Sequence, residues 1–154
     1  MALRKPITYE DLNGNEQTEI FWFNISRREI IKLNAEHKGG FTQWMQNLIE
    51  AEDEKTVHEE FEKILIMSFG IRGDDGKTFD KSDKVKEWFK KHLAYEALYD
   101  ELTTDANAIS EFILGVIPKQ AQAETRKAIS EATPPAEETV SEATPQNAPS
   151  TEGQ

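Results

Sequence analysis

The chain of 154 residues is long enough for one domain with a hydrophobic core and too short for two comfortable domains. It contains no cysteine, which excludes disulfides and thiolate chemistry and fits a reducing cytoplasm. The net charge of −11 argues against free nucleic acid as a partner, because phosphate binding requires a concentrated basic surface. There is no apolar run near the ~18 residues of a membrane helix, and the N-terminal residues lack the apolar segment of a signal peptide.

The first predicted element is a β-hairpin at Asn13-Gly14, a dipeptide that strongly favours a short connection between strands. The strand-like segments RKPITYEDL and EQTEIFWFNI lie on either side of it. In the second segment, Phe21 and Phe23 point to one face of the strand, whereas Trp22 points to the other. We expect a strand that is apolar on both faces to be covered on both, or to meet another chain. Two strands are marginal alone, so the hairpin should pack against helices.

Helices follow the hairpin. Ser26 and Glu29 have the spacing of a capping box, so the first helix should begin at Ser26 and end near Gly39-Gly40. A second helix should follow directly, and a third should begin at Thr56 and end at Gly70. The apolar residues of these three helices are Ile30, Ile31 and Leu33, then Phe41, Trp44, Met45, Leu48 and Ile49, then Val57, Phe61, Ile64, Leu65 and Phe69.

The segment GIRGDDGKTFDKSD, after the third helix, has the composition of a ligand-binding loop. However, Gly70 and Gly76 enclose five residues, which is one more than a phosphate-binding loop allows. If Gly76 takes the sixth position of a calcium loop, only Asp75 supplies a suitable ligand. The segment therefore predicts a tight turn or short hairpin at Asp75-Gly76.

The remaining helices are predicted between Ser82 and Pro118. Ser82 or Asp83 caps the first of them, Thr104 or Asp105 caps the last, and Pro118 stops it. Their apolar stripes are Val85, Trp88 and Phe89, then Tyr95, Leu98, Tyr99 and Leu102, then Ile109, Phe112, Ile113, Val116 and Ile117. The predicted fold is α+β, mainly α, with an N-terminal β-hairpin followed by a compact bundle of five or six short helices.

The composition changes after Pro118, so we expect a folded domain over residues 1–118 and a tail over residues 119–154. The tail has no aromatic residue, is rich in Pro, Ala, Glu and Thr, and carries three basic residues against six glutamates, a net charge of −3. Such a sequence buries too little apolar surface to offset its ordering entropy, so we expect an acidic, disordered tail. A short helix can form across KQAQAETRKAISEA, because Ala, Gln, Glu and Lys favour helix.

The sequence shows no pattern typical of catalysis or cofactor binding. His58 and Glu62 share a helix face in HEEFE, but a zinc-peptidase helix requires a second histidine at position 62. The three histidines stand in no nucleophilic triad pattern. Paired acids such as Asp74-Asp75 and Glu59-Glu60 occupy positions expected on turns or polar faces, where they are solvated. We therefore predict a protein that is not an enzyme and that has no metal or other cofactor.

Several motifs occur in a defined order: FWFNIS, a double glycine before a helix, SFG before the Asp-Gly turn, AYEALYDELTTDA and the closing FILGVIP. This order, over about residues 8–118, resembles the tail assembly chaperones of long-tailed bacteriophages. The resemblance implies a non-enzymatic protein that binds the tape measure protein, keeps it soluble and assists tail tube assembly. It also implies the tail tube protein and a frameshifted longer form of the chain as partners, a location in the host cell cytoplasm, and absence from the mature virion.

A helical domain with apolar stripes could cover the apolar faces of a long helical partner by helix-in-groove contacts. We hypothesise that Trp22, Trp44 and Trp88 anchor the partner where they are exposed, because aromatic anchors dominate binding energetics. The competing interpretation places all three in the core. Two other functions stay open at this point: an acidic helical adaptor or inhibitor that acts by protein–protein interaction, and a small hydrolase built on His58, Glu62 and nearby carboxylates.

Overall fold

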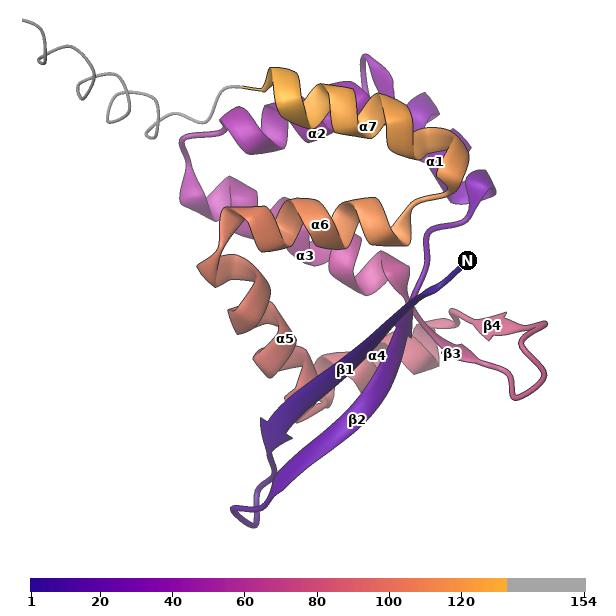
Figure 1. The fold of residues 1–154 in the computed structure, drawn as a ribbon, viewed down its shortest axis with the longest axis vertical. Coiled ribbons are helices and arrows are strands. Elements are labelled where there is room, and N and C mark those ends of the chain that lie inside the picture. The colour runs from indigo at the N-terminus through magenta and orange to yellow at the C-terminus, as the bar shows by residue number, and fades with distance from the viewer. Residues whose placement is uncertain (133–154) are drawn as a thin grey trace, which may run out of the picture.

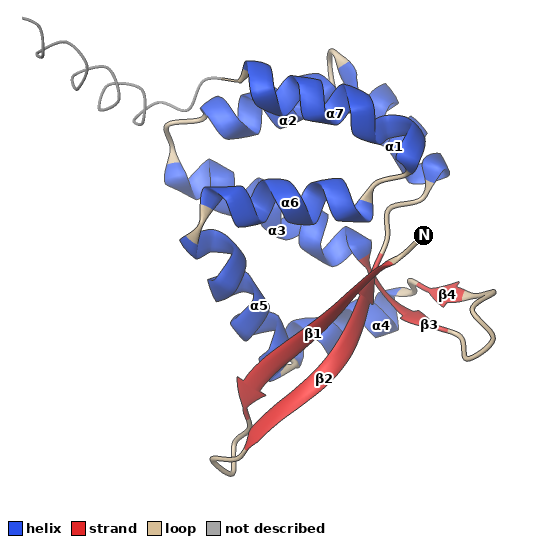
Figure 2. Ribbon diagram, in the orientation of Figure 1, coloured by secondary structure: helices blue, strands red, loops and turns tan. Residues whose placement is uncertain are grey.

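The computed structural model describes residues 1–132, which form one antiparallel sheet and seven helices (Figures 1 and 2). The strand order is β1-β2-β3-β4, with bounds Leu3–Glu10, Glu16–Phe23, Phe69–Arg72 and Phe79–Asp80. The helices are α1 Arg27–Glu36, α2 Gly40–Glu50, α3 Glu54–Ser68, α4 Asp83–Lys91, α5 Leu93–Thr104, α6 Ala106–Val116 and α7 Lys119–Glu131. The predicted mainly α, α+β class is confirmed. The rest of the expected tail, residues 133–154, lies outside the described residues.

The β1–β2 hairpin forms as predicted. Gly14 has a φ of +84°, and the Asp11 carboxylate accepts backbone hydrogen bonds from Asn13 and Asn15, each at 2.9 Å. Phe21 and Phe23 lie on the face that packs against the helices and are buried. The opposite face, which we call the outer face, presents the even-numbered residues of both strands, and helices of the described chain do not cover it. The first part of the expectation, coverage of both faces, therefore fails within residues 1–132.

The sheet continues with β3 and β4, which form the short hairpin predicted as one alternative at Asp75-Gly76, whereas the pairing of β3 with β2 is not predicted. The third helix ends at Ser68, not at Gly70, because the next two residues pair with the end of β2 in an antiparallel register. The Asp75-Gly76 turn is confirmed: Gly76 has a φ of +74°, and the Asp75 carboxylate accepts a hydrogen bond from the Lys77 amide at 2.9 Å. The turn folds β4 back onto β3, where the Phe79 ring covers Gly70 so closely that an added Cβ would lie 2.6 Å from it.

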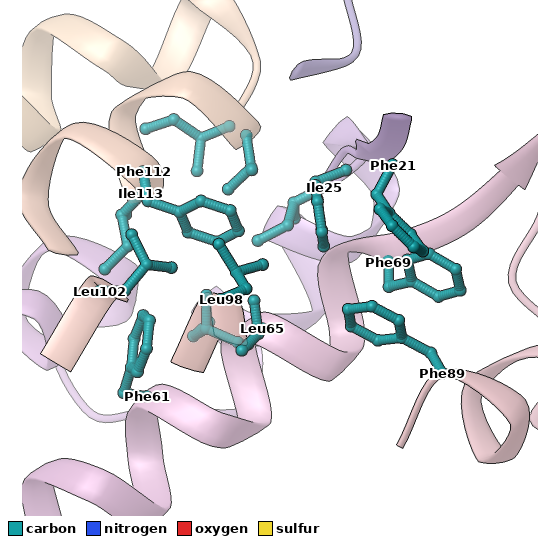
Figure 3. Close-up of a cluster of buried hydrophobic side chains, with 14 of the residues drawn as sticks. Phe21, Ile25, Phe61, Leu65, Phe69, Phe89, Leu98, Leu102, Phe112 and Ile113 are labelled. Carbon is teal, nitrogen blue, oxygen red and sulfur yellow. The ribbon is translucent and has the colours of Figure 1, made fainter. Parts of the chain in front are cut away.

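The core joins the sheet to the helices through aromatic rings (Figure 3). Phe23 is fully buried, and its ring centroid lies 5.8 Å from those of Phe69 and Phe89 and 5.3 Å from that of Phe112. Phe69 and Phe89 stack in parallel at 3.9 Å. One strand residue thus touches β3, α4 and α6. In the predicted stripe of α4, Val85 and Phe89 are buried, whereas Trp88 is half exposed.

The helix ends mostly follow the predicted capping residues. Ser26 and Glu29 form the capping box before α1: the Ser26 Oγ accepts from the Glu29 amide at 3.2 Å, and the Glu29 carboxylate accepts from the Ser26 amide at 2.8 Å. Asp105 caps α6 by accepting from the Asn107 amide at 2.9 Å. The third helix starts earlier than predicted, because Asp53 caps it in place of a start at Thr56.

Helix α7 extends the packed structure beyond Pro118, where the composition changes. It packs chiefly on α2 and buries Thr125 and Ala128. The Gln46 side chain donates to the Ala128 carbonyl at 3.4 Å, and the Gln122 side chain donates to the Leu114 carbonyl at 3.1 Å. Small residues on one face of α7 let this helix lie close to α2 and α6. Because the segment packs without aromatic side chains, its composition alone resembles that of a disordered tail.

The half-buried ion pair between Lys81 and Glu29 attaches the segment between β4 and α4 to the start of α1. The Lys81 ammonium donates to both oxygens of Glu29 at 2.8 and 2.7 Å and to the Asn24 carbonyl at 2.7 Å. Burial by itself would raise the pKa of the Glu29 carboxyl, but the hydrogen bonds from Lys81 and the Ser26 amide, with the Lys81 charge, outweigh burial and lower it. Burial lowers the pKa of Lys81 despite its partner, so the pair stabilises less than its short distances suggest.

We expect Glu29→Gln to reduce the acid sensitivity of the fold. The pKa of Glu29 is lower in the folded chain than its ordinary value, so its contribution is present above that ordinary value and is lost as pH falls through the folded-state pKa. Urea unfolding followed by circular dichroism should show wild-type stability falling more steeply than that of the variant below about pH 4.5. Glu36→Gln, an exposed change in the same helix, should leave the wild-type slope unchanged. Identical slopes for wild type and Glu29→Gln would contradict the assignment.

Candidate partner-binding surfaces

An apolar groove of about 610 Å³ opens between two layers of helices. Helices α2 and α7 form one layer and α3 and α6 form the other (Figure 1). Met45 and Phe61 are buried at its base, whereas Ile109 is partly exposed. Its apolar lining consists of Met45, Leu48, Ile49, Val57, Phe61, Ile109 and Ile129. The groove therefore exposes an apolar surface that a partner can contact while the domain stays folded.

Polar groups border this groove at the turn between α5 and α6. Thr104, Asp105, Asn107 and Ser110 line it there, and Asp105 is already engaged as the cap of α6. Ala132 also lines the groove, so residues 133–154 begin at its edge. An apolar base with a polar border is typical of surfaces that receive one face of an amphipathic helix.

Side-chain hydrogen bonds hold the α6–α7 connection, whose residues do not line the groove. Pro118 follows the last residues of α6 and begins α7 with extended backbone, so the chain changes direction there. The Gln122 side chain donates to the carbonyls of Leu114 and Ile117 and holds the two helices at this angle. Helix α7 then packs on α2, and the groove is lined by residues of α2, α3, α6 and α7.

Trp44 lies beside the groove. It is partly buried on α2, where its ring stacks on Phe41 with centroids 5.5 Å apart. Its indole N–H donates to the Glu60 carboxylate at 2.9 Å. The pKa of Glu60 is lowered by hydrogen bonds from Lys63 and then from Trp44. Trp44 also lines a hollow of about 250 Å³ that shares Leu48 and Ala51 with the groove.

Trp88 is the most exposed of the three tryptophans, with 47% of its surface accessible. It projects from α4, with one face against Phe69 at 6.2 Å and its edge near His92 at 4.9 Å between centroids. Ile71, which is 48% exposed, follows Phe69 on the same side of β3. Trp88 and Ile71 thus leave apolar surface in solvent on the helix side of the sheet.

Trp22 lies on the outer face of the sheet and is partly exposed. The Arg72 guanidinium sits 5.0 Å from the centre of its ring, a cation–π distance. The three tryptophans therefore occupy β2, α2 and α4, and within residues 1–132 no ring contact joins any two of them. Each tryptophan therefore stays a separate candidate anchor, and the hypothesis that exposed members of the three bind a partner stays a prediction.

His58 and Glu62, the two residues of the hydrolase alternative, each form a hydrogen bond with a tyrosine. His58 is exposed, and its Nδ1 lies 2.6 Å from the Tyr99 hydroxyl. Glu62 is exposed and accepts a hydrogen bond from the Tyr95 hydroxyl at 2.5 Å. The pKa of Tyr95 is raised, first by burial and then by this bond to Glu62. Within residues 1–132 no group of histidines and carboxylates has the arrangement of a metal site.

Comparison with known families decides the class of protein. The family model described as phage tail assembly chaperone matches residues 2–154. The chain belongs to this family. The match confirms the resemblance given by the ordered motifs and extends it through α7 and the tail. Neither the curated proteins nor the solved structures gave a match.

The general role of the chaperone follows from its family: it serves the assembly of a phage tail through contacts with other proteins. The part of the chain that the structure describes contains no helix both long and apolar enough to cross a membrane. The sequence does not predict the groove, because residues 119–131, which form α7, are expected to belong to the tail. The signal that could have found it is the spacing of Ala121, Thr125 and Ala128 on one helix face.

We expect Trp44 and Trp88 to differ in their contribution to stability. Trp44→Ala removes a stacked ring and leaves Glu60 without one of its donors, so it should lower the free energy of unfolding by about 2–3 kcal/mol. Trp88→Ala removes a ring that is half in solvent and should lower it by about 1 kcal/mol. Urea unfolding of both variants measures the difference. Equal losses would show that Trp88 belongs to the core as much as Trp44 does.

Proposed function

We propose that the chaperone binds the tape measure protein of its phage, keeps it soluble before the tail tube forms around it, and assists tube assembly without catalysis. The observation that carries this proposal is the apolar groove between α2, α7, α3 and α6. A tape measure protein is a long helical chain whose apolar faces would aggregate if left uncovered. A groove with an apolar base can cover one such face.

The size of the groove favours reversible binding. Burying one large aliphatic side chain contributes about 1.5–3 kcal/mol, so the few side chains that fit 610 Å³ contribute on the order of 5–10 kcal/mol. Association itself costs about 4–15 kcal/mol in lost translational and rotational freedom. A single groove therefore binds a helix weakly. Many chaperones along one tape measure protein can cover it and still be displaced when the tube subunits arrive.

The charge of the chaperone supports the solubilising part of the proposal. Its net charge is −11, and a strongly charged surface keeps complexes apart by mutual repulsion. The proposal also includes the partners and setting that the family implies: the tail tube protein, a frameshifted longer form of the chain, the host cell cytoplasm, and absence from the mature virion.

We expect a charge in the groove to abolish capture of the tape measure protein. Ile109→Glu places a carboxylate on the partly exposed wall of the groove, where a bound apolar helix would leave it without a partner. Co-expression with the tape measure protein, followed by affinity purification, should show capture reduced at least about 10-fold, equivalent to ~1.4 kcal/mol. Ile31→Glu makes the same change on α1 at a residue that is 59% exposed, and should bind as wild type.

The comparison requires that Ile109→Glu and Ile31→Glu each have a melting temperature within a few degrees of that of the wild type. Capture of the tape measure protein by Ile109→Glu at the wild-type level would overturn the groove as its site. Equal loss of capture by Ile31→Glu would show that added negative charge, rather than the groove, decides binding.

The exposed tryptophan gives an independent test of partner anchoring. If Trp88 anchors a partner, Trp88→Ala should lower the amount of tape measure protein that co-purifies while the melting temperature changes little, because the ring is half exposed in the free chaperone. Trp44→Ala should lower both quantities. Unchanged co-purification with Trp88→Ala would remove Trp88 from the binding surface and leave the groove as the remaining candidate.

A further inference from the structure

The outer face of the sheet carries a concave site that the proposed function does not use. A hollow of about 480 Å³ opens where β2 meets the β3–β4 hairpin. Trp22 and Phe79 supply its aromatic surface, and the position of Phe79 is fixed because its ring covers Gly70. Asn24, Arg72, Lys77 and Thr78 supply its polar surface. This hollow is separate from the groove, with which it shares no lining residue.

The charge of this site is opposite to that of the chain. Arg72 and Lys77 line the hollow, no carboxylate lines it, and Arg4 stands opposite Trp22 in the strand register. Within residues 1–132, none of these three cations forms an ion pair, although the chain carries 29 acidic residues against 18 basic ones. The site therefore concentrates unpaired positive charge beside two aromatic rings.

The geometry of Arg72 suits an anionic peptide. Its guanidinium stacks over Trp22 at 5.0 Å, which holds the group in place while leaving N–H donors for a carboxylate. Only one donor bond of this side chain is made within the described residues, from Nη1 to the Gly73 carbonyl at 3.2 Å. A peptide whose carboxylate binds Arg72 and whose neighbouring aliphatic side chain packs on Trp22 or Phe79 would engage both the cationic and the aromatic part of the site.

The segment after Ala132 has the matching chemistry. Residues 133–154 contain four glutamates and no lysine or arginine, and Val140 stands between Glu138 and Glu142. These 22 residues can span up to about 70 Å when extended. A domain of 132 residues has a radius of gyration of about 14 Å, so the end of the segment can reach any part of its surface, whereas Val140, eight residues after Ala132, can lie at most about 28 Å from it.

We propose that residues 133–154 of the same chain dock on the outer face, with glutamates on Arg4, Arg72 and Lys77 and Val140 against the aromatic rings. Exposed ion pairs contribute only about 0–1 kcal/mol each. The covalent connection offsets this weakness, because it provides an effective concentration in the millimolar range. Docking would shield the exposed aromatic surface of the free chaperone and would yield to a more strongly acidic partner. The inference does not rest on binding of the tape measure protein.

The absence of cysteine allows a direct test in the full chain. Ser141→Cys introduces a single site for a nitroxide spin label, and the three tryptophan indole N–H groups give three separate signals in a ¹⁵N NMR spectrum. At about 20 mM salt, docking should reduce the Trp22 indole signal by more than half and affect Trp88 less. A tail that does not dock should instead broaden Trp44 most, because Trp44 lies beside the groove from whose edge the segment begins.

Charge variants distinguish docking from chance proximity. Arg72→Gln with Lys77→Gln should restore the Trp22 signal, as should about 0.5 M salt, which screens exposed ion pairs. The matched control, Lys32→Gln with Lys38→Gln, removes two exposed cations elsewhere and should leave the Trp22 broadening unchanged. A Trp22 signal that is unaffected at low salt, or broadening that survives Arg72→Gln with Lys77→Gln, would overturn the proposal.

A mixed sample tests the choice of occupant. Spin-labelled chains without ¹⁵N, mixed with ¹⁵N-labelled wild-type chains, should leave the Trp22 signal intact. Broadening in that mixture would mean that the tail of a second copy occupies the site and would refute docking within one chain. Capture of the tape measure protein is measured separately, with the groove variants, so failure of one idea does not imply failure of the other.

Discussion

The burial of one face of β2 is the constraint on which the rest of the structure depends. Phe23 contacts Phe69, Phe89 and Phe112 at once, so a single strand residue joins the sheet to α4 and α6. A shift of one residue in the strand register would move Phe23 to the outer face and bury Trp22 instead. The aromatic core therefore also decides which aromatic side chains stay accessible to partners.

The distribution of large and small side chains among the helices accounts for the groove. Helices α3 and α6 contribute Phe61 and Phe112 to the aromatic core, whereas α7 packs on α2 and buries only the small residues Thr125 and Ala128. Two layers built from such different side chains do not close over each other completely. Apolar surface therefore stays accessible in the groove, which is consistent with a family of assembly chaperones.

Charge is divided between the surfaces in a way that suits a chaperone. The groove is bordered by polar groups with few charges and the hollow on the outer face is basic, although the chain as a whole carries a net charge of −11. An acidic surface limits association between like chains, while an apolar groove and a basic hollow each accept a different class of segment. The groove and the hollow share no lining residue, so the two proposed kinds of binding concern separate surfaces.

The sequence by itself determined the hairpin, the capping box at Ser26, the Asp75-Gly76 turn and the apolar stripes, because each depends on residues close in the chain. The ordered motifs also sufficed to indicate the family. Only the tertiary structure decided that Phe69 leaves its helix for a strand, that α7 joins the packed domain, and that Trp22, Trp44 and Trp88 lie apart. Those outcomes depend on pairing with β2 and packing on α2, contacts between residues far apart in the chain that no local pattern encodes.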